Sequence, residues 1–264
     1  MTYEQEAGRA ACEGGMMLDL DAIPRTIVWF SAGAASAVAA KLTLAEGPAV
    51  IAYTNPGSEH PDNERFIADC ETWFGQEVVR LRSARYRDTW QVYEERRYLN
   101  GPAGALCTSE LKKRVRFKFQ RPDDRQVFGY TIEEEKRAAR FREQNPGVDL
   151  WCPLIEARLS HADCLGMIQH AGIELPVLYR LGYGHNNCIP CVKGGMGYWN
   201  KIRQDFPAEF ERMAQLEREI GASCINGIFL DELDPGRGNF ATEPKIECSL
   251  LCELAEAKLE ATDA

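Results

Sequence analysis

The feature that most constrains the fold is an apolar run that ends at a cluster of small residues. Residues 27–30 read Ile-Val-Trp-Phe, a run typical of a buried strand, and Ser31-Ala-Gly-Ala-Ala-Ser36 follows at once. A helical pattern covers residues 34–45. A strand, a small-residue turn and a helix N-terminus together can bind phosphate, because the free N–H groups of the first helical turn face the anion. The sequence therefore predicts an anion-binding turn.

Strand and helix signals alternate further along the chain. Residues 49–53, 78–81 and 127–130 have the composition of buried strands. Residues 61–74 form a predicted helix, with a proline in its first turn and a glycine at its end. This alternation predicts an α/β fold, a three-layer sandwich with a parallel sheet of about five strands and helices on both faces.

Composition and charge exclude several classes of protein. The chain of 264 residues carries a net charge of -9, which argues against a protein that coats nucleic acid by bulk electrostatics. Its longest apolar stretch is interrupted by Lys41 and Glu46, so no membrane span is expected. The first residues are polar and acidic, unlike a secretory signal. These observations predict a cytoplasmic protein.

The ten cysteines suggest metal or redox chemistry, because a cytoplasmic chain does not rely on a disulfide frame. Cys188 and Cys191 are two residues apart in a polar loop, and Cys107 stands just ahead of a basic helical segment. Thiolates suit iron–sulfur clusters and zinc equally well by spacing alone. Cys70 and Cys164 fall inside amphipathic helices and are expected to be core residues.

Several motifs in order along the chain resemble the phosphoadenosine phosphosulfate (PAPS) reductase family, within the adenine-nucleotide alpha-hydrolase group that includes the PP-loop ATP pyrophosphatases. The turn at residues 31–36 stands where that group carries Ser-Gly-Gly-x-Asp-Ser. The other matching fragments are Asn55-Pro-Gly-Ser-Glu-His-Pro61, Cys107 to Lys112, Trp151-Cys-Pro-Leu154 and the stretch from Gly182 to Cys191.

The resemblance implies binding of an adenine nucleotide, whether ATP, adenosine phosphosulfate (APS) or PAPS. The residues that it assigns to the nucleotide are Ser31, Ala32, Gly33, Ala34, Ala35, Ser36, Gly57 and Glu59. Two departures bear on the chemistry. Ala35 stands where pyrophosphatases usually hold Asp, which puts ATP cleavage in doubt. Thr131 replaces an arginine that holds the substrate in the family, so substrate recognition is expected to differ.

The resemblance also implies a 4Fe-4S cluster. The cluster-bearing branch of the family uses an adjacent Cys-Cys pair and a later Cys-x-x-Cys, and Cys107, Cys188 and Cys191 match three of those ligands. Leu106 replaces the fourth. Cys248 resembles the family's C-terminal attacking cysteine, and three roles for it stay open: fourth ligand, nucleophile or structural cysteine. The fourth cluster position could equally be left open as a reactive iron site. Zinc is the alternative metal.

Several polar and charged residues are candidates for supporting roles in the site. Lys112 is the expected catalytic cation for the substrate phosphate or the cluster, although its basic segment could equally be a solvated helix face. His185 is close enough in sequence to the Cys-x-x-Cys loop to support a metal ligand. His161 and His170 are expected to be surface or capping residues.

The leading hypothesis is a sulfonucleotide reductase-like oxidoreductase, which requires a thiol reductant protein as partner. The first alternative is an ATP-dependent sulfur transferase that modifies nucleic acid by DNA phosphorothioation or tRNA thiolation. The second is a non-catalytic nucleotide- or zinc-binding module. The predicted parts are an irregular lead-in at 1–24, a nucleotide-binding α/β domain at 25–180 and a cysteine-rich helical region at 181–264, packed on that domain. A homodimer is left open.

Overall fold

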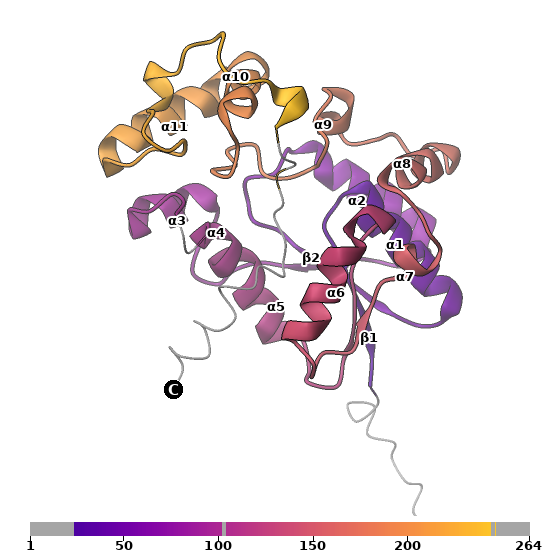
Figure 1. The fold of residues 1–264 in the computed structure, drawn as a ribbon. Coiled ribbons are helices and arrows are strands. Elements are labelled where there is room, and N and C mark those ends of the chain that lie inside the picture. Colours follow the sequence, from indigo (N-terminus) through magenta and orange to yellow (C-terminus); the bar gives the residue numbers. More distant parts are fainter. Residues whose placement is uncertain (1–23, 102–103, 244–245, 247–264) are drawn as a thin grey trace, which may run out of the picture.

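The computed structural model describes residues 24–101, 104–243 and 246. Its centre is a five-stranded sheet in which every strand pair is parallel, with the order β3-β2-β1-β4-β5 (Figure 1). The strands are β1 (Thr26–Phe30), β2 (Val50–Thr54), β3 (Val79–Leu81), β4 (Arg125–Val127) and β5 (Leu150–Trp151). The predicted α/β class, the parallel pairing and the strand number are confirmed.

Helices cover both faces of the sheet, because alternate side chains of the central strand point to opposite sides. Val28 and Phe30 of β1 pack with the helices α1 (Ala34–Glu46), α2 (Asp62–Phe74) and α8 (His161–His170). Ile27 and Trp29 face the other layer, which contains α6 (Glu135–Gln144). The buried Cys70 and Cys164 lie in the first layer, as expected for core residues.

A second hydrophobic core lies beside the sheet layers and contains the cysteine loop. Trp90 and Tyr93 of α3 (Thr89–Arg96) pack there with Trp199 of α10 (Met196–Asp205) and Phe210 of α11 (Pro207–Ile220). Figure 1 shows these helices at one end of the molecule, away from α1 and α8. The amphipathic helix expected near residues 206–221 is therefore confirmed, whereas the one expected at 248–260 falls outside the described residues.

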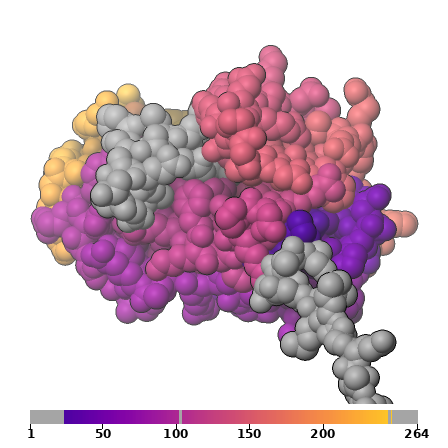
Figure 2. Space-filling model, turned by 90° about the horizontal axis from the view of Figure 1, so that it is seen from below, coloured from indigo at the N-terminus to yellow at the C-terminus, as the bar shows by residue number. Residues whose placement is uncertain are grey.

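The basic segment after Cys107 is helical, as predicted, but not uniformly so. It consists of α4 (Leu106–Thr108), a π-helical turn over Ser109–Lys113, and α5 (Arg114–Phe119). π-helical turns inside helices are rare and often mark functional positions. Seen from below, the magenta segment that carries these turns lies between the orange-yellow C-terminal helices and the indigo start of the sheet domain (Figure 2).

The remaining elements are short connections around this frame. Among the described residues these are α7 (Pro153–Glu156), α9 (Val177–Arg180) and three 3₁₀ turns at Ile132–Glu134, Leu230–Glu232 and Phe240–Thr242. The Ser160 capping box at the start of α8 is present, with the hydroxyl accepting the Asp163 N–H. Within the described part of the chain, no helix has both the length and the apolar character that a bilayer crossing requires.

The prediction for β4 was wrong in its position. The strand begins at Arg125 and ends at Val127, whereas the apolar pattern placed it at residues 127–130. The reason is Gln126, which is buried because its Oε1 accepts a hydrogen bond of 2.6 Å from the indole of Trp29. A satisfied polar side chain can occupy a sheet interior, and an apolar pattern does not detect it.

Gly129, just after β4, lets this strand approach α1. A Cβ built at Gly129 would lie 2.8 Å from both Cα and N of Ser36. We expect Gly129→Ala to lower the free energy of unfolding by about 1–3 kcal/mol, because the obstacle is backbone that cannot rotate away. Urea denaturation measures this change.

Gly166→Ala is the matched control, since Gly166 is exposed in α8 and a Cβ there meets no atom within 4 Å. It should raise the stability by roughly 0.5–1 kcal/mol, the usual gain of alanine over glycine inside a helix. Equal effects of the two substitutions would contradict the packing argument.

Candidate functional site

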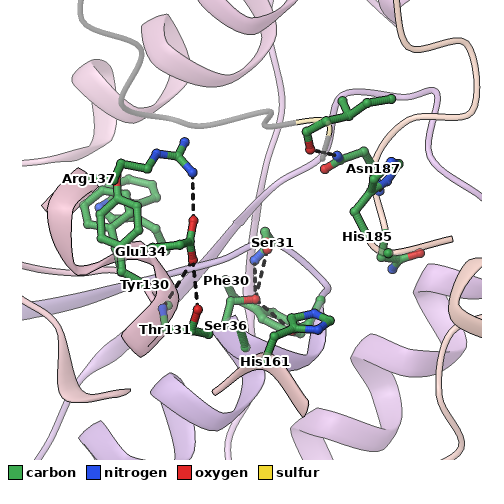
Figure 3. A pocket seen from close by; sticks show the side chains of 18 of the residues that line it. Phe30, Ser31, Ser36, Tyr130, Thr131, Glu134, Arg137, His161, His185 and Asn187 are labelled. Carbon is green, nitrogen blue, oxygen red and sulfur yellow. Dashed lines mark hydrogen bonds and ion pairs between the residues drawn. The ribbon is translucent and has the colours of Figure 1, made fainter. Parts of the chain in front are cut away.

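A pocket of about 370 Å³ opens at the carboxyl ends of β1 and β4 (Figure 3). These two strands are neighbours, yet the chain runs from β1 outward to β2 and β3 before it returns to β4 on the other side. Loops therefore diverge on either side of the β1–β4 boundary, and parallel sheets bind ligands in the resulting crevice. The lining comes from the β1–α1 turn, the segment after β4, α8, α9, the loop at residues 184–187, Thr54, Lys112 and Ile246.

The β1–α1 turn forms the floor of the pocket, with its two serines tied together. The Ser31 N–H donates to Ser36 Oγ at 3.0 Å, and Ser36 Oγ donates to the Gly33 carbonyl at 2.9 Å. Gly33 is the N-cap of α1, and no side chain caps the helix there. A 13-residue helix thus directs the positive end of its dipole toward the pocket.

The hydroxyl of Tyr179 also lies against this turn. It would be 3.1 Å from a Cβ at Gly33, and its oxygen interacts with the Ala34 N–H. Burial raises the pKa of Tyr179 to about 12, so the phenol remains protonated at neutral pH. A neutral phenol keeps a hydroxyl donor beside the helix N-terminus without adding a negative charge there.

Asn186 Oδ1 and Thr54 Oγ1 are buried polar atoms in the lining that make no hydrogen bond with the described residues. Each belongs to a residue that is 5% exposed. Leaving such atoms unpaired costs free energy, so a site that contains them is suited to a ligand with polar hydrogens. Together with the helix N-terminus, they give the pocket both anion-binding groups and hydrogen-bond acceptors.

Lys112 reaches the pocket from the π-helical turn and forms a buried ion pair with Glu59. Its Nζ lies 3.3 Å from Glu59 Oε1, and the two side chains are 8% and 4% exposed. Glu59 Oε2 accepts from the hydroxyl of Tyr53 at 2.6 Å and from Asn63 Nδ2 at 2.9 Å. Burial, and then the Glu59 charge, raise the pKa of Tyr53, so this phenol stays a donor.

The pocket wall formed by the segment after β4 contains the carboxylate of Glu134 and the guanidinium of Arg137. Thr131 and Glu134 form a capping box, so the residue that replaces the expected arginine has a structural role. Glu134 Oε1 accepts a hydrogen bond of 2.8 Å from Arg137, whose guanidinium lies 5.3 Å from the centre of the Tyr130 ring. Figure 3 shows Arg137 and Glu134 on the side of the pocket opposite Asn187. Arg137, six residues after Thr131, therefore places a guanidinium in this wall although the expected arginine at position 131 is missing.

The predicted nucleotide-binding residues separate into three groups. Ser31, Gly33, Ala35 and Ser36 line the pocket, and Lys112 lines it with them. Ala32 and Ala34 are fully buried within the same turn, and Glu59 lies behind the lining as the partner of Lys112. Gly57 is the exception. It has a left-handed φ of 73°, and a Cβ there would lie 2.2 Å from the carbonyl of Arg87, so its position has a packing reason.

All three predicted metal ligands among the described residues act on the hydroxyl of Tyr93, Cys107 by a hydrogen bond and Cys188 and Cys191 by their charges. That hydroxyl donates to Cys107 Sγ at 3.4 Å and to the Pro190 carbonyl at 3.5 Å. Its pKa is raised well above the ordinary value by burial first, and then by the charges of Cys107, Cys191 and Cys188. The sequence-distant thiols therefore share one buried environment.

The chemistry of this donor set fits a thiophilic metal centre, because thiolates are the ligands of iron–sulfur clusters and zinc. Among residues 24–101, 104–243 and 246, no three His, Cys, Asp or Glu side chains are arranged to hold a metal ion. Cys248, the predicted fourth ligand or nucleophile, lies outside the described residues. The metal assignment consequently stays a prediction.

Sequence reasoning missed several pocket residues. His161 was expected to be a surface or capped residue. It is half-buried at the start of α8 and lines the pocket, with its ring centre 5.8 Å from that of Tyr179. Asn186, Thr54 and Tyr179 gave no periodic or motif signal. Asn186 does lie three residues after Tyr183, inside the fragment that resembles the family's Cys-x-x-Cys ending, and that position could have flagged it.

Comparison with known proteins gives distant similarities. No family model matches the chain. An uncharacterized 37.8 kDa protein from the gpa 5′ region of Escherichia phage 186 is 26% identical over 98 residues, which cover 36% of this chain and 29% of that protein. The chain thus matches less than a third of that relative's length. Among solved structures, PAPS reductase from Candida auris in a phosphate complex gives a TM-score of 0.47 at 10% identity, covering 64% of this chain and 84% of that one.

The half-buried His185 in the pocket wall should make stability depend on pH. Burial lowers its pKa to about 4 from an ordinary value of 6.5, so between these values the unfolded chain binds a proton that the folded chain excludes. Stability should therefore fall as the pH drops from 6.5 to 4, by about 3 kcal/mol if this group acts alone.

Urea denaturation of His185→Gln across this range checks the assignment. The variant should lose most of the pH dependence, because glutamine does not titrate. His170→Gln, which changes an exposed histidine at the end of α8, should keep it. The same slope in His185→Gln and wild type would contradict the assignment to His185.

Proposed function

We propose that this chain is an enzyme that binds an adenine nucleotide and carries out sulfur chemistry beside a thiolate-bound metal centre, as the resemblance to PAPS reductases implies. The observation that carries the proposal is the position of Lys112. It lines the pocket at the carboxyl edge of the sheet, belongs to the helical segment that begins at Leu106 and contains Cys107, and is held by its ion pair with Glu59. A nucleotide in the pocket would therefore have its reactive end close to the cysteine site.

The pocket suits a nucleotide in size and polarity. A volume of about 370 Å³ lies within the range of roughly 300–1,000 Å³ typical of small-molecule sites. The α1 N-terminus and the hydroxyls of Ser31 and Ser36 are assigned to a phosphate group. Lys112 and Arg137 supply positive charge, and the unpaired acceptors on Asn186 and Thr54 suit hydroxyl or amino hydrogens of the ligand.

Cys107, Cys188 and Cys191 are the residues assigned to a 4Fe-4S cluster, with zinc as the alternative. When bound, such a centre would supply a Lewis-acidic metal for the sulfur chemistry. Tyr93 would donate its phenolic hydrogen to a cysteine sulfur, as it does to Cys107 Sγ. Hydrogen bonds to ligand sulfurs orient them and tune the metal that they hold.

In the reductase reaction, Cys248 is the proposed nucleophile. Its thiolate attacks the sulfur of the sulfonucleotide, a Cys–S–SO₃⁻ bond forms, and the S–O bond to the phosphate breaks, releasing the nucleotide. A dithiol partner protein then attacks Cys248 Sγ, releases sulfite and is oxidised to its disulfide as it supplies two electrons. Lys112 would stabilise the negative charge that develops on the leaving phosphate.

A sulfur transferase that acts on nucleic acid is the second candidate. The set of only three matching cysteines, Cys107, Cys188 and Cys191, favours it, since three protein ligands would leave one metal position open for sulfur. Ala35 weighs against it, because it lines the pocket where ATP pyrophosphatases hold an aspartate that assists magnesium. The reductase is therefore the leading proposal.

Product analysis separates these functions. Anaerobically purified protein would be incubated with APS, PAPS or ATP, with dithiothreitol as reductant. Sulfite release from APS or PAPS supports the reductase, and pyrophosphate release from ATP supports the transferase. Neither product, in a protein that still binds the nucleotide, would contradict an enzymatic role and leave a binding module.

The metal assignment makes a further prediction. Cys107→Ala and Cys191→Ala should each remove most of the bound iron and acid-labile sulfide, or zinc, because each deletes a thiolate ligand. Metal analysis with the visible absorption spectrum measures the loss. Cys164→Ala is the control, since burial raises the pKa of that thiol to about 12 and it packs in the α1–α8 layer. Unchanged metal in both ligand variants would end the assignment.

A further inference from the structure

The side chain of Asn186 joins the pocket floor to the segment that supports it. Its Nδ2 donates to the carbonyl of Ala32 at 2.6 Å and to Asn63 Oδ1 at 2.8 Å. Asn186 is 5% exposed and Asn63 is 2% exposed, so water does not compete with these hydrogen bonds. A buried amide held in this way has a fixed orientation, and it fixes the groups that it contacts.

The Ala32 carbonyl is a place where such a contact matters. Ala32 is fully buried and has φ of 54°, which lies in the left-handed region. That region is unfavourable for residues with a Cβ and persists only where neighbouring contacts impose it. Hydrogen bonds of Ser36 fix Ser31 and Gly33 on either side, and Asn186 fixes the carbonyl of Ala32 itself.

The other end of this connection leads to the cysteine site. Asn63 donates to Glu59, and Glu59 pairs with Lys112 in the π-helical turn after Cys107. The loop that carries Asn186 is also attached directly to the segment beside Glu59, because the Ile189 N–H donates to the Ser58 carbonyl at 3.1 Å. A buried hydrogen-bonded chain therefore links the phosphate-binding turn to both segments that hold the predicted metal ligands.

We propose that Asn186 is a positioning residue that holds the β1–α1 turn in its ligand-binding conformation. This inference rests on the proposed function, in which the turn binds the phosphate of a nucleotide. Without the amide, Ala32 returns to a negative φ, and the N–H groups at the start of α1 lose their common direction. The affinity for the nucleotide then falls in proportion to the fraction of molecules that keep the turn.

Calorimetry with AMP tests the proposal. Asn186→Ala should bind AMP at least ten-fold more weakly than the wild type. Adding Ala32→Gly should restore at least three-fold of that loss, because glycine adopts a φ near 54° without a steric cost. Ala32→Gly alone is measured as the reference for the double variant. If Asn186→Ala folds poorly, Asn186→Ser, whose shorter side chain does not reach both acceptors, gives the same comparison.

Unchanged affinity in Asn186→Ala would overturn the proposal, and so would a loss that Ala32→Gly does not restore. A wild type that binds no AMP would instead contradict the proposed function. In that case amide hydrogen exchange still decides the inference. Exchange at residues 33–36 should be faster in Asn186→Ala and slow again in the double variant, whereas equal exchange in all three proteins would overturn it.

Discussion

The candidate site depends on the position of β1 at the centre of a parallel sheet. The strand order reverses there, with β2 on one side and β4 on the other, so the connecting loops diverge above its carboxyl end. Gly129 then allows the segment after β4 to touch the start of α1. The pocket floor is a helix N-terminus for this reason, and its walls come from segments more than 150 residues apart in the chain.

Buried polar groups maintain this arrangement, and the Lys112–Glu59 pair shows how partners offset the cost of burying a charge. The carboxylate of Glu59 is almost completely buried, yet Lys112, Tyr53 and Asn63 contact its two oxygens. A buried charge with this many donors is tolerated, whereas removing one partner typically destabilises a protein by about 3–5 kcal/mol. The same contacts connect the cysteine-bearing helix to the pocket, so stability and the proposed chemistry depend on one set of residues.

Much of this frame could be predicted from the sequence, because apolar runs and small-residue turns report local structure directly. Residues 27–30 and the turn at 31–36 are examples. The start of β4 could not be predicted, since Gln126 becomes compatible with the sheet interior only through its bond to Trp29. Lys112 and Glu59 were each singled out, but their pairing spans 53 residues and depends on the tertiary fold. The role of Asn186 could not be predicted either, because it depends on Ala32 being held with a positive φ in the folded chain.

The most direct test of the central claim is a crystal structure of anaerobically purified protein with AMP, the nucleotide part common to APS and ATP. We expect the phosphate of AMP to contact the turn at residues 31–36. Asn186 Oδ1 or Thr54 Oγ1 should accept a hydrogen bond from the nucleoside. AMP bound elsewhere, or an empty pocket at saturating AMP, would contradict the assignment of this sheet edge as the nucleotide site.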